Sequence, residues 1–149
     1  MYSKIPKPIF YLLTFTWGLP FTLLGLAAAL FLLLGGHKPK KHGYCYYFEV
    51  GEHWGGTELG IFFIKDKTDS RHLKCHEHGH ALQNCFWGPF MVPFISLPSF
   101  TRYWYRRIRQ KLDKNVKLPP YDAIWFEGQA TKWGSDFIAQ LEEKEGKGG

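Results

Sequence analysis

The chain has 149 residues, a formal net charge of +6 and an aromatic content of 18%. This length suits one domain and excludes a large multidomain enzyme. The positive net charge would favour binding to nucleic acid or to anionic lipid. No basic–aromatic motif for nucleic-acid binding is present, so we predict no nucleic-acid partner. Lys and Arg lie beside two apolar blocks, residues 9–36 and 85–100, which favours membrane lipid as the partner.

The first apolar block, residues 9–36, contains no charged residue. It is longer than the roughly 20 residues that a spanning helix needs, and too long for the apolar core of a signal peptide. We therefore predict a retained transmembrane helix, kinked rather than ended between Gly18 and Pro20. More Lys residues follow the block closely than precede it, which places the main domain on the cytoplasmic side of the membrane.

The region after the anchor is predicted to form strands and then a helix. Residues 37–42 are a polar linker, so the anchor and linker span 1–42. Residues 44–50 and 57–64 are rich in aromatic and β-branched side chains, which predicts a hairpin in a small antiparallel sheet. Ser70 is a suitable N-cap for a helix that runs to about residue 84. The fold class is therefore predicted to be α+β.

The second apolar block, residues 85–100, contains three prolines. A regular spanning helix is disfavoured, so we predict a membrane-associated segment that dips into the bilayer or lies on it. The alternative is a proline-kinked piece of soluble core. A polar loop over residues 112–122 and a helix over residues 123–141 follow, which completes a main domain of 43–141. Residues 142–149 are predicted to be a disordered tail.

The three cysteines are Cys45, Cys75 and Cys85, and no CxxC pair occurs. An odd number leaves at least one thiol unpaired. On one helix, Cys75 and Cys85 would lie about 15 Å apart, which is too far for a disulfide. Free thiols are typical of a reducing compartment and agree with a cytoplasmic main domain.

Residues 76–80 read His-Glu-His-Gly-His and match the pattern H-E-x-x-H. Positions i and i+4 of a helix share a face, so His76 and His80 can bind one metal ion. Glu77 lies beside that face and can act as the general base on a metal-bound water. Imidazole ligands and an open position favour Zn²⁺. His78 is predicted to face solvent or to support the site, and His72 is predicted to be a surface residue.

A catalytic zinc site needs a third protein ligand. Glu127 is the best candidate, because it is an isolated carboxylate in an apolar and aromatic stretch, where metal coordination would offset the cost of burial. Asp122 is its rival. Glu49, Glu52 and Glu58 precede the motif and are weaker alternatives.

The motif and its surroundings resemble a known family. The sequence His-Glu-His-Gly-His-Ala-Leu-Gln over residues 76–83, with the Gly-Pro pair at 88–89 and Leu-Pro-Ser at 97–99, is similar to small, largely uncharacterised membrane-anchored HExxH proteins of the bacterial inner membrane. More broadly it resembles the gluzincin arrangement of thermolysin-like peptidases. The resemblance covers roughly residues 43–134. It implies zinc bound by His76, His80 and Glu127, Glu77 as general base, and an edge strand at 57–64 that binds an extended peptide.

Two features depart from the thermolysin-like pattern. Thr131 stands where those enzymes carry an Asp that orients a ligand His. The residue that stabilises the oxyanion is not assigned, and Tyr121 is one candidate. Residues 115–122 faintly resemble the Asp-bearing segment of site-two proteases, but the basic stretch before them is too charged for a membrane core.

The predicted function is that of a membrane-anchored zinc endopeptidase, in which Glu77 activates a zinc-bound water to hydrolyse peptides or membrane proteins at the membrane surface. The alternative is a non-catalytic membrane interaction or assembly protein with a structural or vestigial metal site. A zinc hydrolase that acts on another substrate class also stays open, because HExxH does not name the substrate.

Overall fold

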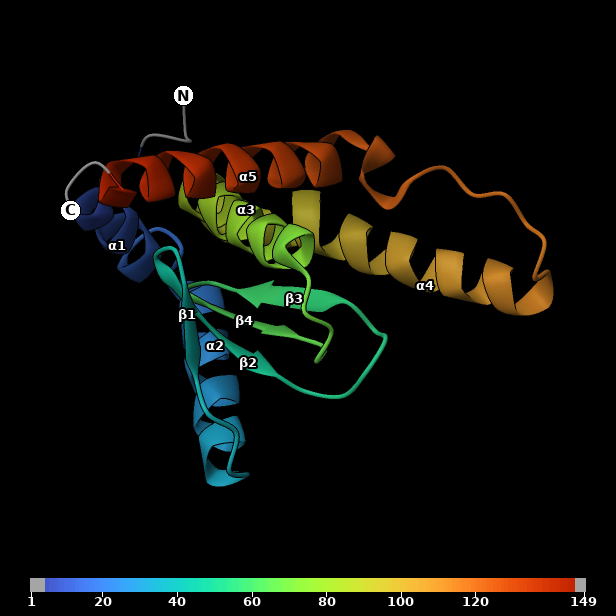
Figure 1. Ribbon diagram of the computed structural model, residues 1–149, viewed down its shortest axis with the longest axis horizontal. Helices are drawn as coiled ribbons and strands as arrows, with labels where there is room; N and C mark the ends of the chain where they lie inside the picture. Colours follow the sequence, from blue (N-terminus) through green and yellow to red (C-terminus); the bar gives the residue numbers. More distant parts are fainter. Residues whose placement is uncertain (1–4, 147–149) are drawn as a thin grey trace.

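A computed structural model describes residues 5–146 and has an α+β architecture (Figure 1). Helix α5 (Trp125–Gly146) lies along α3 (Arg71–Trp87), and α3 lies between α5 and a four-stranded sheet. The helix that carries the HExxH motif is therefore central and is covered on several sides. This placement accounts for the unusual burial of its polar residues.

The sheet is mixed, with the strand order β1-β2-β4-β3. Its strands are β1 (Lys40–His42), β2 (Cys45–Glu49), β3 (Gly56–Leu59) and β4 (Phe62–Lys65). The outer pairs are antiparallel, but β2 and β4 are parallel. The predicted antiparallel hairpin is therefore wrong. Gly60, with φ of +74°, turns the chain inside the predicted second strand and divides it into β3 and β4.

The apolar N-terminal block forms two helices, α1 (Lys7–Phe15) and α2 (Leu19–Leu34), instead of one kinked helix. Pro20 has no N–H to bond the carbonyl of Thr16 and its ring clashes there, so the helix ends and a new one begins. Within residues 5–146, no single helix has both the length and the apolar character to cross a membrane. Only α1 and α2 taken together have the length and composition for a span, and the angle of the bend between them is 88°.

The N-terminal helices pack against the rest of the fold. Phe10 of α1 is fully buried in the main core, together with Cys45, Phe63, Leu82 and Phe137. Gly25 of α2 lies so close to the β3–β4 turn that an added Cβ would be 2.0 Å from the carbonyl oxygen of Leu59. The predicted linker also ends in a strand, because its last residues form β1.

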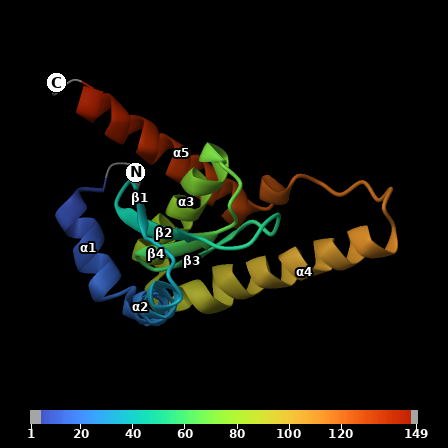
Figure 2. The same cartoon turned by 60° about the horizontal axis from the view of Figure 1, so that its bottom comes forward.

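The proline-containing block is an irregular helical segment. After α3 ends at Trp87, a 3₁₀ turn (Gly88–Phe90) and a π-helical stretch (Val92–Ser96) lead into α4 (Leu97–Leu112). Met91 and Ile95 are buried and pack with Phe21 and Phe126. Helix α4 extends away from the body, and none of its residues is buried (Figure 2).

Several local predictions are confirmed. The Ser70 hydroxyl oxygen accepts a hydrogen bond from the Leu73 N–H at 3.1 Å and caps α3. All three cysteines are free and buried. Helix α5 continues to Gly146 and so includes the first residues of the predicted tail 142–149, whereas residues 147–149 lie outside the described part of the chain.

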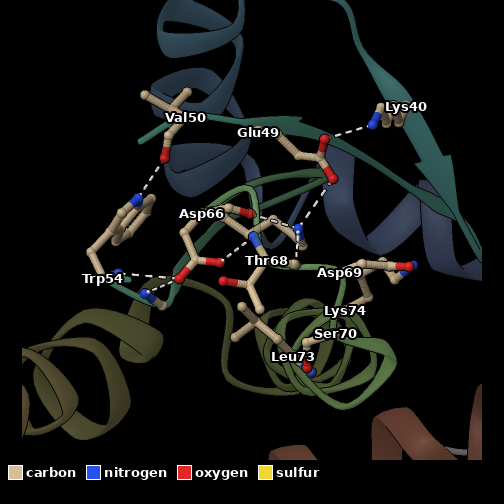
Figure 3. Close-up of polar contacts among 12 residues, drawn as sticks. Lys40, Glu49, Val50, Trp54, Asp66, Thr68, Asp69, Ser70, Leu73 and Lys74 are labelled. Carbon is tan, nitrogen blue, oxygen red and sulfur yellow. Dashed lines mark hydrogen bonds and ion pairs between the residues drawn. The ribbon is translucent and has the colours of Figure 1, made fainter. Parts of the chain in front are cut away.

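A buried Lys fixes the two loops beside the site. Lys65 is fully buried, and its Nζ donates to Glu49 Oε1 at 3.2 Å and to the carbonyl oxygens of Asp66 and Thr68 at 2.6 and 2.8 Å. Figure 3 shows the Asp66 carboxylate, which accepts from the backbone N–H groups of Trp54 and Thr68. It also accepts from the N–H of Gly55. These bonds tie the loop before β3 to the loop that leads into α3.

Candidate metal centre

Helices α3 and α5 approach each other at two glycines. A Cβ added at Gly79 would lie 1.8 Å from the carbonyl oxygen of Ala130, and one added at Gly134 would lie 1.7 Å from that of Cys75. The two backbones are therefore in direct contact, which only glycine permits. This contact brings the first turn of α5, which carries Glu127, against the histidine face of α3.

His76, His80 and Glu127 form a tight, buried cluster. The Nε2 atoms of the two histidines are 3.1 Å apart, and each lies 3.1 Å from Oε2 of Glu127. Each of the three residues is at most 7% exposed. The structure thus brings together the three ligands that the sequence predicts, and this group can hold a metal ion.

The donor atoms fit a small tetrahedral ion. Nitrogen and oxygen ligands at roughly 2.0–2.1 Å from tetrahedral zinc are separated from one another by about 3.3 Å. The separations of 3.1 Å between the three donors are close to this value. Two imidazole nitrogens and one carboxylate oxygen also form a donor set that zinc accepts.

Hydrogen bonds orient each of the three ligands. Thr131 Oγ1 lies 2.9 Å from Nδ1 of His76, and Gln83 Oε1 lies 2.7 Å from Nδ1 of His80. Ser99 donates a hydrogen bond to Oε1 of Glu127. A partner on Nδ1 leaves Nε2 as the ligand atom. Thr131 therefore contacts a ligand His even though it is not an Asp.

Gln83 and Ser99 are supporting residues that the sequence reasoning did not assign. Gln83 lies three residues after His80 on the same helix face, and this spacing could have predicted the contact between the two side chains. Its amide nitrogen also donates to the carbonyl oxygen of Phe126 at 2.8 Å, which fixes the side chain. Ser99 comes from α4, and only the tertiary structure brings it to Glu127.

The charges at the cluster favour a cation between the imidazoles. Burial raises the pKa of Glu127, but hydrogen bonds from His76 and His80 outweigh this effect and hold the pKa well below its usual range. Burial lowers the pKa of His80, yet Glu127, Glu77 and Glu58 together raise it to about 9. Burial keeps the pKa of His76 below its usual value. The shared carboxylate therefore stabilises positive charge at this position, as a metal ion would provide.

Glu77 lies beside the cluster with one oxygen free. The side chain is buried, and its Oε2 has no hydrogen-bond partner among residues 5–146. Burial raises its pKa to about 7; the charge of His80 opposes this rise and that of Glu127 adds to it. A Cβ added at Gly56 would lie 2.7 Å from Oε1 of Glu77, so the backbone of β3 lies directly against this carboxylate.

The cluster opens into a cleft of about 750 Å³. Strand β3 and its preceding loop, α3, α4 and the short helix Tyr121–Ala123 line it. The Tyr121 hydroxyl lies 3.2 Å from Ser99 Oγ, and burial raises the pKa of Tyr121 to about 12. His72 is exposed at the rim of this cleft, as predicted for a surface residue.

The rival carboxylates stay outside the ligand cluster. Asp122 and Glu58 line the cleft, but neither belongs to the group that can hold a metal. Glu49 pairs with Lys40 and Lys65 in the sheet. Glu52 is exposed in the loop before β3. Glu127 is therefore the only one of the proposed carboxylates that meets His76 and His80.

The prediction that His78 faces solvent is wrong. Its side chain is fully buried, its ring stacks on Phe137 with centroids 4.7 Å apart, and its Nε2 accepts a hydrogen bond from the Tyr44 N–H. The physical reason is that α3 is enclosed on both sides, so the face opposite the metal ligands also meets protein.

In comparisons with known proteins, no family model, curated protein or solved structure matches this chain. The functional assignment therefore depends on the chemistry of the site itself.

Proposed function

We propose that this protein is a zinc-dependent endopeptidase. One observation carries the proposal: His76 and His80, which together with Glu127 can hold a metal ion, line the same cleft as Glu77, a buried carboxylate whose Oε2 has no hydrogen-bond partner among residues 5–146. Zinc sites that serve only structure usually have four protein ligands and are closed, whereas catalytic sites have three and an open position. Three candidate ligands, two of which line a cleft of about 750 Å³, support the catalytic type.

Zinc held by His76, His80 and Glu127 would supply a Lewis acid and lower the pKa of a bound water. Glu77 is placed to accept a proton at Oε2 and to deliver it to the leaving amine. Its pKa of about 7 suits both transfers, because a general base works best when its pKa is near the operating pH. We assign the Tyr121 hydroxyl as the donor to the developing oxyanion, because Tyr121 lines the cleft and its ring centroid lies 6.3 Å from that of His76.

The position of strand β3 favours a peptide as the substrate. It is an edge strand of the sheet, so one side of its backbone has no strand partner, and its residues line the cleft. An extended peptide can add to such an edge through main-chain hydrogen bonds. The proposed binding edge is shorter than residues 57–64, because β4 is an interior strand.

We further propose that the protein is held at a membrane, with its cleft on the cytoplasmic side. The support is that α2 exposes large apolar side chains along its length, namely Leu23, Leu24, Leu26, Leu30, Phe31, Leu33 and Leu34. Surfaces of this kind are unusual on a protein that is surrounded by water. Substrates would then be membrane proteins or peptides presented at the bilayer.

The test uses the purified full chain beside Glu77→Gln. Zinc content is measured by elemental analysis, and cleavage of a mixed peptide library is followed by mass spectrometry. We expect about one zinc per chain in both proteins, and peptide cleavage only in the wild type, lowered roughly 10²- to 10⁴-fold in the variant.

Two results would contradict the proposal. Absence of zinc from the wild type, even after reconstitution, would remove the metal site. Zinc in both proteins without cleavage of any peptide, or with equal cleavage, would favour the alternative of a non-catalytic membrane protein with a structural metal.

A further inference from the structure

Helix α4 presents an apolar stripe away from the body of the protein. Leu97, Trp104, Ile108 and Leu112 follow a spacing of seven, four and four residues, so they share one helix face. Their exposed fractions are 59%, 49%, 54% and 80%. Side chains of this size are normally covered, but the described residues leave about half or more of each one exposed.

Basic residues flank this stripe. The sixteen residues of α4 include four Arg and one Lys and no acidic residue. Arg102 and Arg106 donate to the carbonyl oxygens of the loop that precedes α5, which holds the other side of the helix against the body. Arg109 and Lys111 are exposed near the apolar stripe. An apolar stripe between cations complements the surface of an anionic bilayer, with its apolar acyl chains beneath negative headgroups.

The apolar surface continues beyond α4 toward the N-terminal helices. Phe90 and Phe94 are 53% and 52% exposed, and their ring centroids are 6.4 Å apart. Phe90 also lies 6.2 Å from the ring of Trp17, which is at the corner between α1 and α2. Aromatic side chains therefore connect α4 to the apolar N-terminal helices. Trp and Tyr are the residues that prefer the membrane–water interface, which favours lipid over a protein partner.

We propose that α4 lies in the headgroup region of an anionic membrane, with Leu97, Ile108 and Leu112 facing the acyl chains and Trp104 at the edge of the stripe. The same helix lines the cleft with Ser99, Phe100, Tyr103 and Trp104, so the lipid-facing stripe borders the cleft. The lipid contact does not depend on the proposed peptidase activity, whereas the choice of a membrane-bound substrate does.

The experiment compares two positions on α4 in the full chain. Ile108→Cys and Gln110→Cys each introduce an exposed thiol, two residues apart on different faces of the helix, while the native cysteines are all buried and react slowly. Each variant is labelled with an environment-sensitive fluorophore and reconstituted, one chain per disc, into lipid nanodiscs. The discs contain either phosphatidylcholine alone or phosphatidylcholine with about 30% phosphatidylglycerol, a composition chosen to give the surface a negative potential.

In the anionic discs we expect the label at position 108 to emit several-fold more strongly than the label at 110 and to be protected from iodide. The difference should shrink in neutral discs and at high salt, because the basic flank contributes to binding. Equal emission and equal iodide quenching at both positions in anionic discs would overturn the proposal. Protection of position 108 only when two chains share a disc would also overturn it and would identify a second copy as the cover. Zinc content and peptide cleavage do not enter these measurements, so their outcome is separate from that of the peptidase proposal.

Discussion

The two faces of α3 carry the same residue type in opposite states. On one face, His80 lies between carboxylates and its pKa is raised to about 9. On the other face, His78 lies among aromatic rings, and burial lowers its pKa to about 3. The two residues are two positions apart on one helix, and both are buried. Their neighbours from other elements, and not the sequence motif, therefore decide which imidazole lies where positive charge is favoured and which stays neutral.

Helix α3 therefore buries polar side chains in two different ways. At His76 and His80, each ring nitrogen has a polar partner, and a buried negative charge faces them. At His78, one nitrogen accepts a single hydrogen bond and the ring serves as a flat packing surface. A cluster of the first type needs a cation, whereas a histidine of the second type excludes one.

The largest expected effect is on metal binding. His80→Ala or Glu127→Ala removes one of three ligands, so we expect zinc affinity to fall by more than 100-fold, beyond the effect typical of supporting residues. The affinity is measured by competition with a chelator. His72→Ala, at the exposed rim of the cleft, is the matched control and should bind zinc like the wild type. Unchanged affinity in Glu127→Ala would exclude Glu127 as a ligand.

The next effect is on the contact that brings the two helices together. Gly79→Ala puts a methyl group where the carbonyl oxygen of Ala130 lies, so α3 and α5 must separate. We expect a loss of unfolding free energy of about 1–3 kcal/mol or more, together with weaker zinc binding. Gly146→Ala, which meets no atom within 4 Å, is the control and should leave both unchanged. Chemical denaturation in detergent measures the difference.

A smaller effect is expected from the hydroxyl that orients His76. Thr131→Val keeps the shape of the side chain but removes the partner of Nδ1, so zinc affinity should fall about 10- to 100-fold. Thr131→Ser keeps the hydroxyl and should restore most of the affinity. If Val and Ser variants bind zinc equally well, the hydrogen bond does not orient the ligand.

The smallest expected effect is the pH dependence of the unfolding free energy that arises from His78, on the face of α3 opposite the candidate metal ligands. The pKa of His78 is about 3 in the folded chain and 6.5 when unfolded, so the unfolded chain binds more protons between these values. His78 therefore stabilises the fold fully above pH 6.5, and this contribution falls by up to about 1.4 kcal/mol per pH unit as the pH drops below that value. In His78→Gln, which can still accept from Tyr44, unfolding free energy should vary less between pH 7.5 and 5.5. An identical pH slope would show that His78 is not buried as a neutral group.

Much of the candidate site was predictable because it depends on local spacing. The i, i+4 pair of histidines and the cap at Ser70 follow from helix geometry alone. Glu127 was predictable for another reason, because a lone carboxylate in an apolar stretch needs a partner. The N-terminal block was less predictable. Its composition favours one long helix that Pro20 only kinks, but the first helix ends before Pro20, and Phe10 of that helix is buried in the core.

The sequence by itself determined the ligand types, their helical spacing and the α+β class, because these depend on the chemistry of single residues and on periodicity within one element. Only the tertiary structure decided the parallel pairing of β2 with β4, the burial of His78, and the approach of Ser99 and Thr131 to the candidate ligands. These features join segments that are far apart in the chain. The physical reason is that such contacts depend on which surfaces pack together, and one-dimensional patterns do not record that choice.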